Sequence, residues 1–490
     1  MANRPDLTLD PSDWDALRKL GHQMLDDVFD NLRHIRETPV WRPMPASEQS
    51  RFEENLPYRP QDPEAVYADF KQLVFPYPGG NIHPRFWGWV MGSGNATGVL
   101  ADMLAAAMNS NVCLGDHAAI KVEQQVLAWC KQLLGYPDSA SGLLTSGASM
   151  ANLTALAAAR DYKSGGKIRR HGARSMPGDM VLYCSDETHN CIRKAAEVMG
   201  MGAASVRQVP VDEHFRIRTA LLEEIVRNDL AEGRIPFCIV GNAGTVNTGA
   251  IDPLDELLAV SRKYGLWFHV DGAFGALAKP LPEYAGVLRA IEEADSVAFD
   301  LHKWLHVPYE AGCVLIRRPD AHRAAFGQAP HYLLRHEHGV SAGSHSFGDY
   351  GIELSRGFKA LKAWMSIKTH GAFAFTALIR QNINQARYLA QLVEQHPHLE
   401  LMAPAGLNIV CFRYMRAGWT MPLAREVNRE ILMRLQEEGI ATLSATMLRG
   451  QYALRAAVSN HRSRFEDFDL LAAQVIRLGN EIGEMVPGSR

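Results

Sequence analysis

Two short apolar runs, each ending in a single charged side chain, constrain this sequence more than any other feature. The first spans residues 266–273 and reaches Asp271, and the second spans residues 296–304 and reaches Lys303. Short apolar strands that carry a reactive side chain at the carboxyl end are the way in which open α/β sheets build ligand sites. We therefore expect Asp271 and Lys303 to face one site.

This pair of side chains suits the cofactor pyridoxal 5'-phosphate (PLP). A lysine amine forms an imine with the cofactor aldehyde. A carboxylate pairs with the pyridine nitrogen and keeps it protonated, so that the ring accepts electrons. Taken singly, Lys303 is better explained as a solvated lysine at a strand end and Asp271 as a helix cap. Together, and with the residues below, they favour the cofactor.

Small residues at the start of a strong helix supply a candidate phosphate site. Residues 146–149 read Ser-Gly-Ala-Ser and open the alanine-rich run 153–160. A helix N-terminus offers free N–H groups and a dipole that favours an anion, and Ser149 adds a hydroxyl donor. Many helices begin in this way, so the turn gains its meaning from Asp271 and Lys303. His189 follows the expected strand 180–184 and can stack on a pyridine ring, although by itself it is better explained as a polar residue at a helix start.

The composition is that of a soluble globular enzyme. Of 490 residues, 47% are hydrophobic and 21% are charged, which suffices for a large core. The formal net charge of −3 gives no reason to expect nucleic acid or an anionic membrane as a partner. Seven scattered cysteines without a C-x-x-C pair argue against a disulfide framework or a zinc site. Because neither a signal peptide nor a membrane-length apolar run is evident, we expect a cytoplasmic protein.

Strands that alternate with helices predict an α/β fold with a mainly parallel sheet. We expect three parts, namely an N-terminal helical arm (1–82), a large PLP-binding domain (83–365) and a small C-terminal α/β domain (366–490). The arm begins with Ser12-Asp13-Trp14-Asp15, which is typical of a capping box with Ser12 as the N-cap. Apolar residues at helical spacing follow it. Such an arm more often packs on a partner subunit than it forms a domain, although packing within one chain stays open.

Residues 83–90 are dense in aromatic side chains. They fit a buried strand and turn as well as they fit one wall of a substrate site. In the second interpretation Arg85 and Phe86 supply a charge and a ring. An aromatic substrate would then lie on Phe86 or Trp87, whereas an acidic substrate would pair with Arg85. Further along, residues 337–350 have the composition of a mobile loop, and the pattern predicts a helix from Ile352 onwards.

Several motifs resemble those of the group II PLP-dependent amino-acid decarboxylases, a family that acts on aromatic L-amino acids, histidine, tyrosine and glutamate. The motifs are Ser146-Gly147-Ala148-Ser149, His189, Gly244-Thr245, His269-Val270-Asp271-Gly272-Ala273 and His302-Lys303-Trp304. They cover nearly the whole chain in order and spacing. The resemblance implies fold type I, a homodimer with shared active sites, and decarboxylation of an L-amino acid.

The resemblance also implies roles for individual residues. Lys303 is then the imine lysine and Asp271 the partner of the pyridinium nitrogen. His189 stacks on one face of the ring and Ala273 packs on the other, while Tyr332 matches a mobile-loop tyrosine that returns a proton after carbon dioxide leaves. The cofactor-binding set comprises Ala148, Ser149, His189, Thr245, Asp271, Ala273, Asp300, His302 and Lys303.

Three positions depart from the family pattern. Many members have asparagine where Asp300 stands, and a carboxylate beside a phosphate is unfavourable unless it faces a donor. Val246 stands where aromatic decarboxylases often have threonine, which leaves Thr245 as the candidate from that loop. Arg85 stands where an aromatic residue often lines the substrate pocket, which affects the expected substrate most.

Five other functions are alternatives to this one. An aromatic aldehyde synthase or an aminotransferase has the same cofactor residues, although synthases of this family tend to have phenylalanine in place of Tyr332. A decarboxylase of an acidic amino acid differs only at the substrate side. A PLP-fold binding protein would not need Lys303, Asp271, His189 and Tyr332 together. A dinucleotide-binding oxidoreductase would need a G-x-G-x-x-G after a strand, which the sequence lacks. We expect an aromatic L-amino acid as the substrate.

Overall fold

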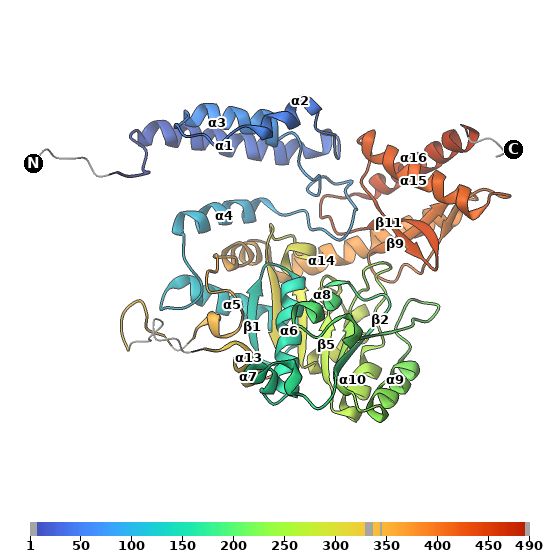
Figure 1. Cartoon of the computed structure of the whole chain (residues 1–490). Helices are drawn as coiled ribbons and strands as arrows, with labels where there is room; N and C mark the ends of the chain where they lie inside the picture. The colour runs from blue at the N-terminus through green and yellow to red at the C-terminus, as the bar shows by residue number, and fades with distance from the viewer. Residues whose placement is uncertain (1–6, 329–336, 344, 486–490) are drawn as a thin grey trace, which may run out of the picture.

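The computed structural model describes residues 7–328, 337–343 and 345–485. The described chain forms a helical N-terminal segment, a large body around one sheet, and a smaller C-terminal part around a second sheet (Figure 1). The N-terminal helices lie as a layer of their own at the top of Figure 1, and the C-terminal part lies at its right. The N-terminal helices are α1 (Trp14–His34), α2 (Ala46–Gln49) and α3 (Pro63–Asp69).

The large sheet has seven strands in the order β1-β7-β6-β5-β4-β2-β3. They are β1 (Ser141–Thr145), β2 (Met180–Ser185), β3 (Val206–Val209), β4 (Ile235–Asn242), β5 (Trp267–Asp271), β6 (Ser296–Asp300) and β7 (Gly312–Ile316). The pairings from β6 through β5, β4 and β2 to β3 are parallel. By contrast, β7 pairs antiparallel with both β1 and β6. This mainly parallel sheet with helices between its strands confirms the expected α/β fold class.

The strands that lead to the two predicted reactive residues, β5 and β6, are neighbours within this sheet. Every residue of β5 and of β6 is buried. This burial explains their continuous apolar sequence, because a strand covered on both faces has no solvent side for polar residues. Since β5 and β6 are parallel, with Asp271 opposite Ala298, their carboxyl ends meet at one edge. Asp271 ends β5, and the chain after β6 turns directly into the short helix that carries Lys303.

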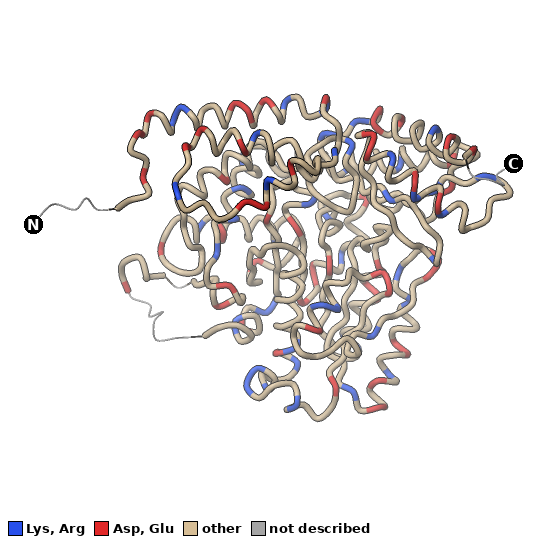
Figure 2. The backbone as a smooth tube through the Cα atoms, turned by 45° about the horizontal axis from the view of Figure 1, so that its top comes forward, with Lys and Arg blue, Asp and Glu red and all other residues tan. Residues whose placement is uncertain are grey.

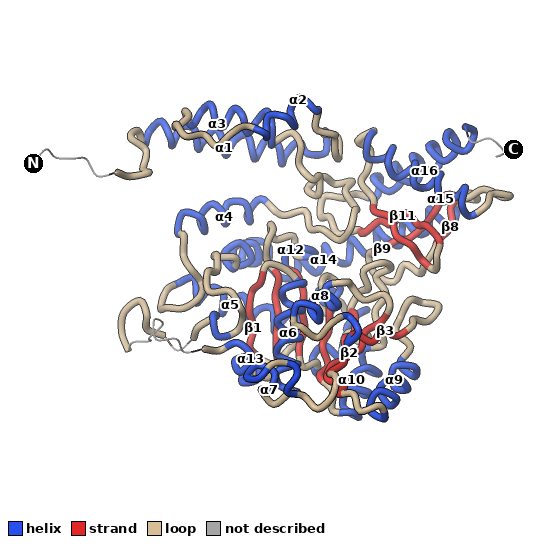
Figure 3. Tube along the Cα trace, in the orientation of Figure 1, coloured by secondary structure: helices blue, strands red, loops and turns tan. Residues whose placement is uncertain are grey.

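Helices cover the large sheet and connect its strands (Figure 3). The helices of this body are α4 (Ala96–Met108), α5 (Ala118–Leu134), α6 (Ala148–Lys163), α7 (Lys167–His171), α8 (Cys191–Val198), α9 (Thr219–Ala231), α10 (Leu254–Tyr264), α11 (Pro282–Ala285), α12 (Leu301–Trp304) and α13 (Pro319–Phe326). The basic segment 163–178 contains the short helix α7. Its buried residue Ile168 gives this short helix an apolar contact with the core.

The C-terminal part is built on an antiparallel sheet of four strands in the order β10-β11-β9-β8. Its elements are α14 (Ala360–Gln395), β8 (Leu399–Leu401), β9 (Ile409–Tyr414), α15 (Met421–Glu437), β10 (Ser444–Leu448), β11 (Gln451–Ala457) and α16 (Phe465–Met485). The helix α14 contains a non-helical residue, Gly371, and packs against both parts of the molecule. The division that the sequence analysis proposes after residue 365 therefore falls inside α14.

Residues 83–90 pack against this C-terminal part. The Trp87 side chain is fully buried there, 4.7 Å from the ring of Phe468 between centroids. Its indole Nε1–H donates to Ser463 Oγ at 3.0 Å, and its backbone N–H donates to the carbonyl oxygen of Thr442 at 2.8 Å. The chain thus passes along the second sheet before it enters the large body, which brings the two parts together around this segment.

The first helix begins one residue later than the capping-box pattern predicts. Asp13 Oδ1 accepts the N–H of Ala16 at 2.9 Å, so Asp13 and not Ser12 is the N-cap. Both residue types cap helices well, and Asp13 adds a charge that the helix dipole favours. The apolar stripe is present but mostly uncovered, since Leu20 is buried while Trp14 is 64% exposed and Leu17 40% exposed.

The stretch before α14 differs from two expectations. The helix begins at Ala360 and not at Ile352, because residues 351–359 form turns and extended chain. Residues 345–350 are packed in spite of their small and polar composition. Phe347 is fully buried, and the guanidinium of Arg356 lies 4.9 Å from its ring centroid. The backbone is held as well, since the Gly348 N–H donates to the Cys113 carbonyl oxygen at 3.3 Å.

Charged residues of both signs are interspersed along the trace, as Figure 2 shows for the N-terminal helices and for the body. Within the described residues, no helix combines the length and the apolar character needed to cross a membrane.

Candidate active site

A cavity of about 800 Å³ opens at the carboxyl ends of β5 and β6. On one side it is lined by residues that the sequence analysis assigned to the cofactor, namely Ala148, Ser149, His189, Asp271, Ala273, Asp300, His302 and Lys303. Its other side is formed by Trp89, Val90, Val246, Asn247, Ser444, Ala445 and Arg455. Hereafter these are called the cofactor side and the substrate side.

Lys303 reaches the cavity from α12, directly after β6. Its Nζ lies 3.2 Å from Asp300 Oδ2, and its side chain is 20% exposed. The tight turn from strand to helix places an amine at the floor of the cavity while its neighbours Leu301, His302 and Trp304 are buried. A lysine held in this way is available to a ligand but shielded from bulk water.

Asp271 faces Lys303 from the end of the neighbouring strand. The residue is only 5% exposed, yet it lines the cavity. Asn152 Nδ2 donates to Asp271 Oδ2 at 3.0 Å, and the Ala273 N–H donates to Asp271 Oδ1 at 3.2 Å. Donors on both oxygens fix the orientation of the carboxylate. A cationic ring nitrogen in the cavity would meet a preformed negative charge.

The N-terminus of α6 forms the anion-binding part of the cofactor side. The first N–H groups of a helix have no partner within it, and Ser149 is exposed to the cavity. The turn can lie this deep because Gly312 of β7 has no side chain. A Cβ atom on Gly312 would stand 2.5 Å from the Cα of Gly147. This close approach of strand and turn provides a site for a phosphate.

Asp300 and His302 lie beneath the same turn. The Ala311 N–H donates to His302 Nδ1 at 3.0 Å, so the proton of the neutral ring is on Nε2. That Nε2 lies 3.6 Å from Asp300 Oδ2. Burial lowers the pKa of His302, and the charge of Asp300 opposes this shift. The other carboxylate oxygen, Asp300 Oδ1, is buried without a hydrogen-bond partner among the described residues. Asp300 therefore faces donors on one oxygen only.

His189 stands at the mouth of the cavity, between β2 and α8. Its Nδ1 accepts the backbone N–H of Cys191 at 3.2 Å, so the proton of the neutral ring is on Nε2. Desolvation lowers the pKa of His189, the nearby Asp271 opposes that effect, and the charge of Lys303 adds to it. Ala273 lines the cavity from the turn after β5.

These residues fit PLP. The cofactor needs an amine for its aldehyde, a carboxylate for its ring nitrogen and N–H donors for its phosphate. Lys303, Asp271 and the N-terminus of α6 supply these three groups around one cavity. No other lysine is among the residues that line this cavity in the described part of the chain.

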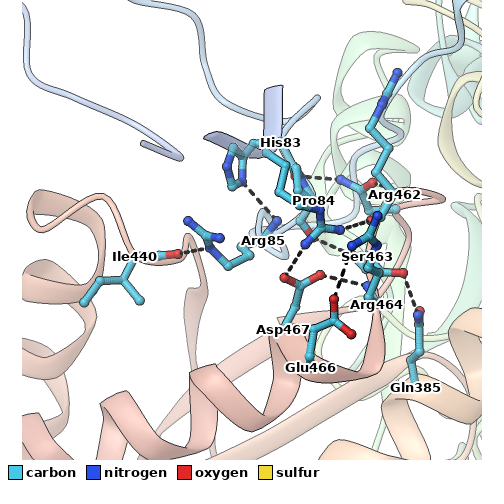
Figure 4. Close-up of polar contacts among 12 residues, drawn as sticks. His83, Pro84, Arg85, Gln385, Ile440, Arg462, Ser463, Arg464, Glu466 and Asp467 are labelled. Atoms are coloured by element: carbon cyan, nitrogen blue, oxygen red, sulfur yellow. Dashed lines mark hydrogen bonds and ion pairs between the residues drawn. The ribbon is translucent and has the colours of Figure 1, made fainter. Parts of the chain in front are cut away.

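The structure does not bring Arg85 or Phe86 to the cavity. Arg85 is not among the residues that line it, and its Nε–H donates to the carbonyl oxygen of Ile440 at 2.7 Å (Figure 4). Phe86 is buried, with its ring centroid 6.1 Å from that of Trp89. Of this segment, Trp89 and Val90 line the cavity. The backbone turns at Trp89, which has a φ of 51°. Residues from this turn onward face the cavity, whereas Arg85 and Phe86 before it do not.

Thr245 also lies outside the cavity wall. Its Oγ1 is 3.0 Å from Thr248 Oγ1 and accepts the N–H of Ala250 at 3.1 Å, so its hydroxyl stabilises its own loop. The next residue, Val246, lines the cavity instead. Adjacent residues of an irregular loop point in different directions, and spacing alone did not identify which one would face inward.

Sequence reasoning missed Arg455, which lines the substrate side although it is 4% exposed. Its guanidinium donates to the carbonyl oxygens of Asn247 at 2.9 Å and Trp89 at 3.0 Å and to Ser444 Oγ at 3.1 Å. It therefore joins three separate segments of the substrate side. An arginine within a strand pattern gives no signal of this role. Tyr332, the expected proton donor, lies outside the described residues.

Comparisons with known proteins agree with this site. A family model described as the pyridoxal-dependent decarboxylase conserved domain matches residues 45–415. The chain is 34% identical over 477 residues to an aromatic-L-amino-acid decarboxylase of Bacillus atrophaeus, covering 96% of this chain and 97% of that protein. It is 29% identical over 472 residues to a phenylacetaldehyde synthase of Arabidopsis thaliana, covering 94% of each chain. A crystal structure of Oryza sativa TDC with PLP and tryptamine is similar, with a TM-score of 0.89 and 26% identity over 97% of this chain and 100% of that chain.

Proposed function

Because the chain belongs to the family of pyridoxal-dependent decarboxylases, we propose that it converts an aromatic L-amino acid to the amine and carbon dioxide. The observation that carries the proposal is the cavity in which Lys303, Asp271 and the N-terminus of α6 meet. The aromatic preference is supported by the apolar side chains Trp89, Val90 and Val246 on the substrate side. It is further supported by the name of the relative that is 34% identical along almost its whole length.

Bound PLP supplies an aldehyde that takes the substrate amine and a cationic ring that withdraws electrons from the bond to the carboxylate. Lys303 Nζ holds the aldehyde until the substrate arrives. Asp271 keeps a negative charge against the ring nitrogen, because Asn152 and the Ala273 N–H stabilise its ionised form. The N–H groups at the start of α6 and the Ser149 hydroxyl bind the phosphate.

Orientation of the substrate is the main contribution of the cavity to the rate. The bond that breaks must stand perpendicular to the cofactor ring, and the substrate side chain sets that angle by its contacts with Trp89 and Val246. His189 and Ala273 border the ring position from the two loops that follow β2 and β5. We propose that they hold the ring flat between them.

A proton must reach the α-carbon after carbon dioxide leaves. We propose the Tyr332 phenol as its source, with His189 as the alternative, because the neutral His189 ring carries its proton on Nε2.

Asp300 has a different role from the one that its place near the phosphate implies. We propose that it holds the Lys303 ammonium before the cofactor binds, since its Oδ2 lies 3.2 Å from Nζ.

We also propose a homodimer with shared active sites. The arm exposes large apolar side chains, including Trp14 at 64% and Val66 at 50%, and a second copy of the chain is the occupant that the family resemblance implies. A stable dimer would need such an apolar surface.

A cytoplasmic location is proposed because all seven cysteines are free and buried, as a reducing compartment leaves them.

The proposed reaction is tested by a panel of L-amino acids that includes tryptophan, tyrosine, phenylalanine and glutamate. Carbon dioxide, amine, aldehyde and ammonia are measured for each, with Lys303→Ala as the inactive control. We expect one amine for each carbon dioxide released from an aromatic substrate. Turnover of glutamate alone would overturn the aromatic assignment, and aldehyde with ammonia in place of amine would indicate an aldehyde synthase.

A further inference from the structure

A chain of buried hydrogen bonds leads away from Asp271 beneath the cofactor side. It passes from Asp271 to Asn152, His269, Ser296 and finally Trp267. All four residues beyond Asp271 are at most 1% exposed. Two of them, Trp267 and Ser296, are the first residues of β5 and β6, whereas Asn152 lies one turn inside α6. The chain therefore links the two strands that carry Asp271 and Lys303 to the helix that faces the phosphate.

The direction of these hydrogen bonds is set by the carboxylate of Asp271, which accepts from the Asn152 amide group and leaves the Asn152 oxygen to accept from His269 Nε2. His269 Nδ1 then accepts the proton of the Ser296 hydroxyl, 2.8 Å away. At the far end Trp267 Nε1, which can only donate, donates to Ser296 Oγ at 2.8 Å. A ring that accepts at Nδ1 carries its proton on Nε2 when it is neutral. Full burial lowers the pKa of His269 to about 4, so the neutral form prevails.

The same direction continues to the carboxylate. His269 Nε2 donates to Asn152 Oδ1 at 2.7 Å, which leaves the Asn152 amide group to face Asp271. Asn152 Nδ2 donates to Asp271 Oδ2 at 3.0 Å and to Cys191 Sγ at 3.2 Å. If the side-chain amide of Asn152 were flipped, its oxygen would face the Asp271 carboxylate and its NH₂ group would face the His269 N–H. Each link therefore excludes the opposite orientation of the next.

We propose that Asn152 and His269 are positioning residues that keep the Asp271 carboxylate turned toward the cavity as an acceptor. Neither touches the reacting atoms. His269 fixes the orientation of the Asn152 side chain, so that Asn152 presents its NH₂ group and not its oxygen to Asp271. Asp271 is then ready to pair with a protonated ring nitrogen. This inference rests on the proposed function, because it assumes that PLP binds with its ring nitrogen at Asp271.

The test uses two pairs of variants. His269→Gln keeps one donor and one acceptor on the same side chain, whereas His269→Leu removes both. Asn152→Leu removes the amide at similar size. Its matched control is Asn428→Leu in α15, since Asn428 is also fully buried and also makes three hydrogen bonds, to the Tyr414 backbone and to the Ala424 carbonyl oxygen. Asn428 belongs to the C-terminal part and is not among the residues that line the cavity.

Each protein is purified with PLP, and two properties besides turnover are measured. These are the dissociation constant of PLP on dilution and the visible circular dichroism of bound PLP, which reports the orientation of the ring. Asn152→Leu and His269→Leu should weaken PLP binding about tenfold or more, as expected for a buried charge that loses its donor, and should change the circular dichroism. His269→Gln and Asn428→Leu should keep the parent values of both, even if they unfold at a lower temperature.

Parent-like PLP binding and circular dichroism in Asn152→Leu would overturn the inference, as would equal behaviour of His269→Gln and His269→Leu. If Asn152→Leu does not yield soluble protein, the two His269 variants decide the question. A parent protein that binds no PLP would instead contradict the proposed function, so the two failures are distinguishable.

Discussion

The two sides of the cavity are built in different ways. On the cofactor side, Asp271 ends one strand and Lys303 follows the neighbouring parallel strand in the short helix α12, so both positions follow from local chain structure and strand register. On the substrate side, Trp89, Val246 and Arg455 come from segments that are far apart in the sequence and meet only because the two sheets pack together. A site of the first kind can be predicted from local patterns, whereas a site of the second kind depends on long-range packing.

The two sides also differ in the groups that stabilise their charges. The cofactor side holds its charges in place with hydrogen bonds from buried neutral groups, as Asn152 does for Asp271. The substrate side has one buried guanidinium, that of Arg455, which donates to backbone carbonyl oxygens and a serine hydroxyl. Its positive charge is spread over these dipoles. We therefore expect changes on the cofactor side to affect the chemical step, and changes on the substrate side to affect substrate binding.

The largest effect is expected for Asp271→Asn. An amide cannot stabilise a protonated ring nitrogen by charge, so kcat should fall about a hundredfold or more while some PLP is retained. Asp295→Asn is the matched control, because Asp295 lies at the opposite ends of β5 and β6 and accepts the Phe268 N–H at 2.9 Å. Steady-state kinetics check both variants, and near-parent turnover in Asp271→Asn would remove this residue from the mechanism.

Acid should destabilise the folded protein, because it contains buried histidines that stay neutral. Burial lowers the pKa of His269, on the cofactor side, and of His461, near Gly94, to about 4. Between pH 6.5 and about 4 the unfolded chain binds protons that these folded residues exclude. Each histidine should therefore cost about 1.4 kcal/mol of stability per pH unit over that range, with no loss above it.

Denaturant unfolding of the parent, His269→Gln and His461→Gln at pH 7 and pH 5 measures this dependence. Each variant should be less sensitive to the change in pH than the parent. If one variant keeps the sensitivity of the parent, the histidine that it replaces does not contribute to the loss of stability in acid.

On the substrate side, Trp89→Ala should raise KM for an aromatic substrate about tenfold, because a large aromatic contact is lost. Its kcat and PLP content should change little. Arg85→Met provides the contrast, since Arg85 bonds to Ile440 outside the cavity and its loss should leave KM near the parent value. A raised KM for Arg85→Met with a normal value for Trp89→Ala would reverse the assignment of this wall.

The smallest effect is expected for Asp300→Asn. The buried Oδ1 of Asp300 lacks a partner among the described residues, and its charge lies beneath the expected phosphate. Replacing the carboxylate by an amide should tighten PLP binding about threefold to tenfold by removing that repulsion. PLP titration compares the two proteins. Weaker binding in Asp300→Asn would mean that the carboxylate itself supports the cofactor.

Local sequence patterns predicted the parts of the molecule that the backbone alone determines. The strands at Asp271 and Lys303, the turn at Ala148 and Ser149 and the mainly parallel sheet all follow from apolar runs and their polar ends. The failures share a physical cause, because they depend on contacts between distant segments. Arg85 was assigned to the cavity because its neighbours are aromatic, yet a turn at Trp89 decides which residues face inward.

Other differences have more local causes. The N-cap is Asp13 and not Ser12 because two adjacent residues are both good caps, and the sequence does not rank them. Residues 345–350 look mobile from composition, but Phe347 is fully buried and holds them in place. Neither the role of Asn152 nor that of Arg455 has a sequence signal, since each depends on a hydrogen bond to a residue far away in the chain.

The most direct test of the central claim is to find the residue that holds PLP. Sodium borohydride reduces the link between the cofactor and its amine to a stable bond, and peptide mapping then locates the label. Lys303 is the one lysine among the described residues that line the cavity, and it stands opposite the charge that the cofactor ring requires. The account predicts a pyridoxyl group on Lys303 alone. A label on any other lysine, or no label in a protein that carries PLP, would contradict it.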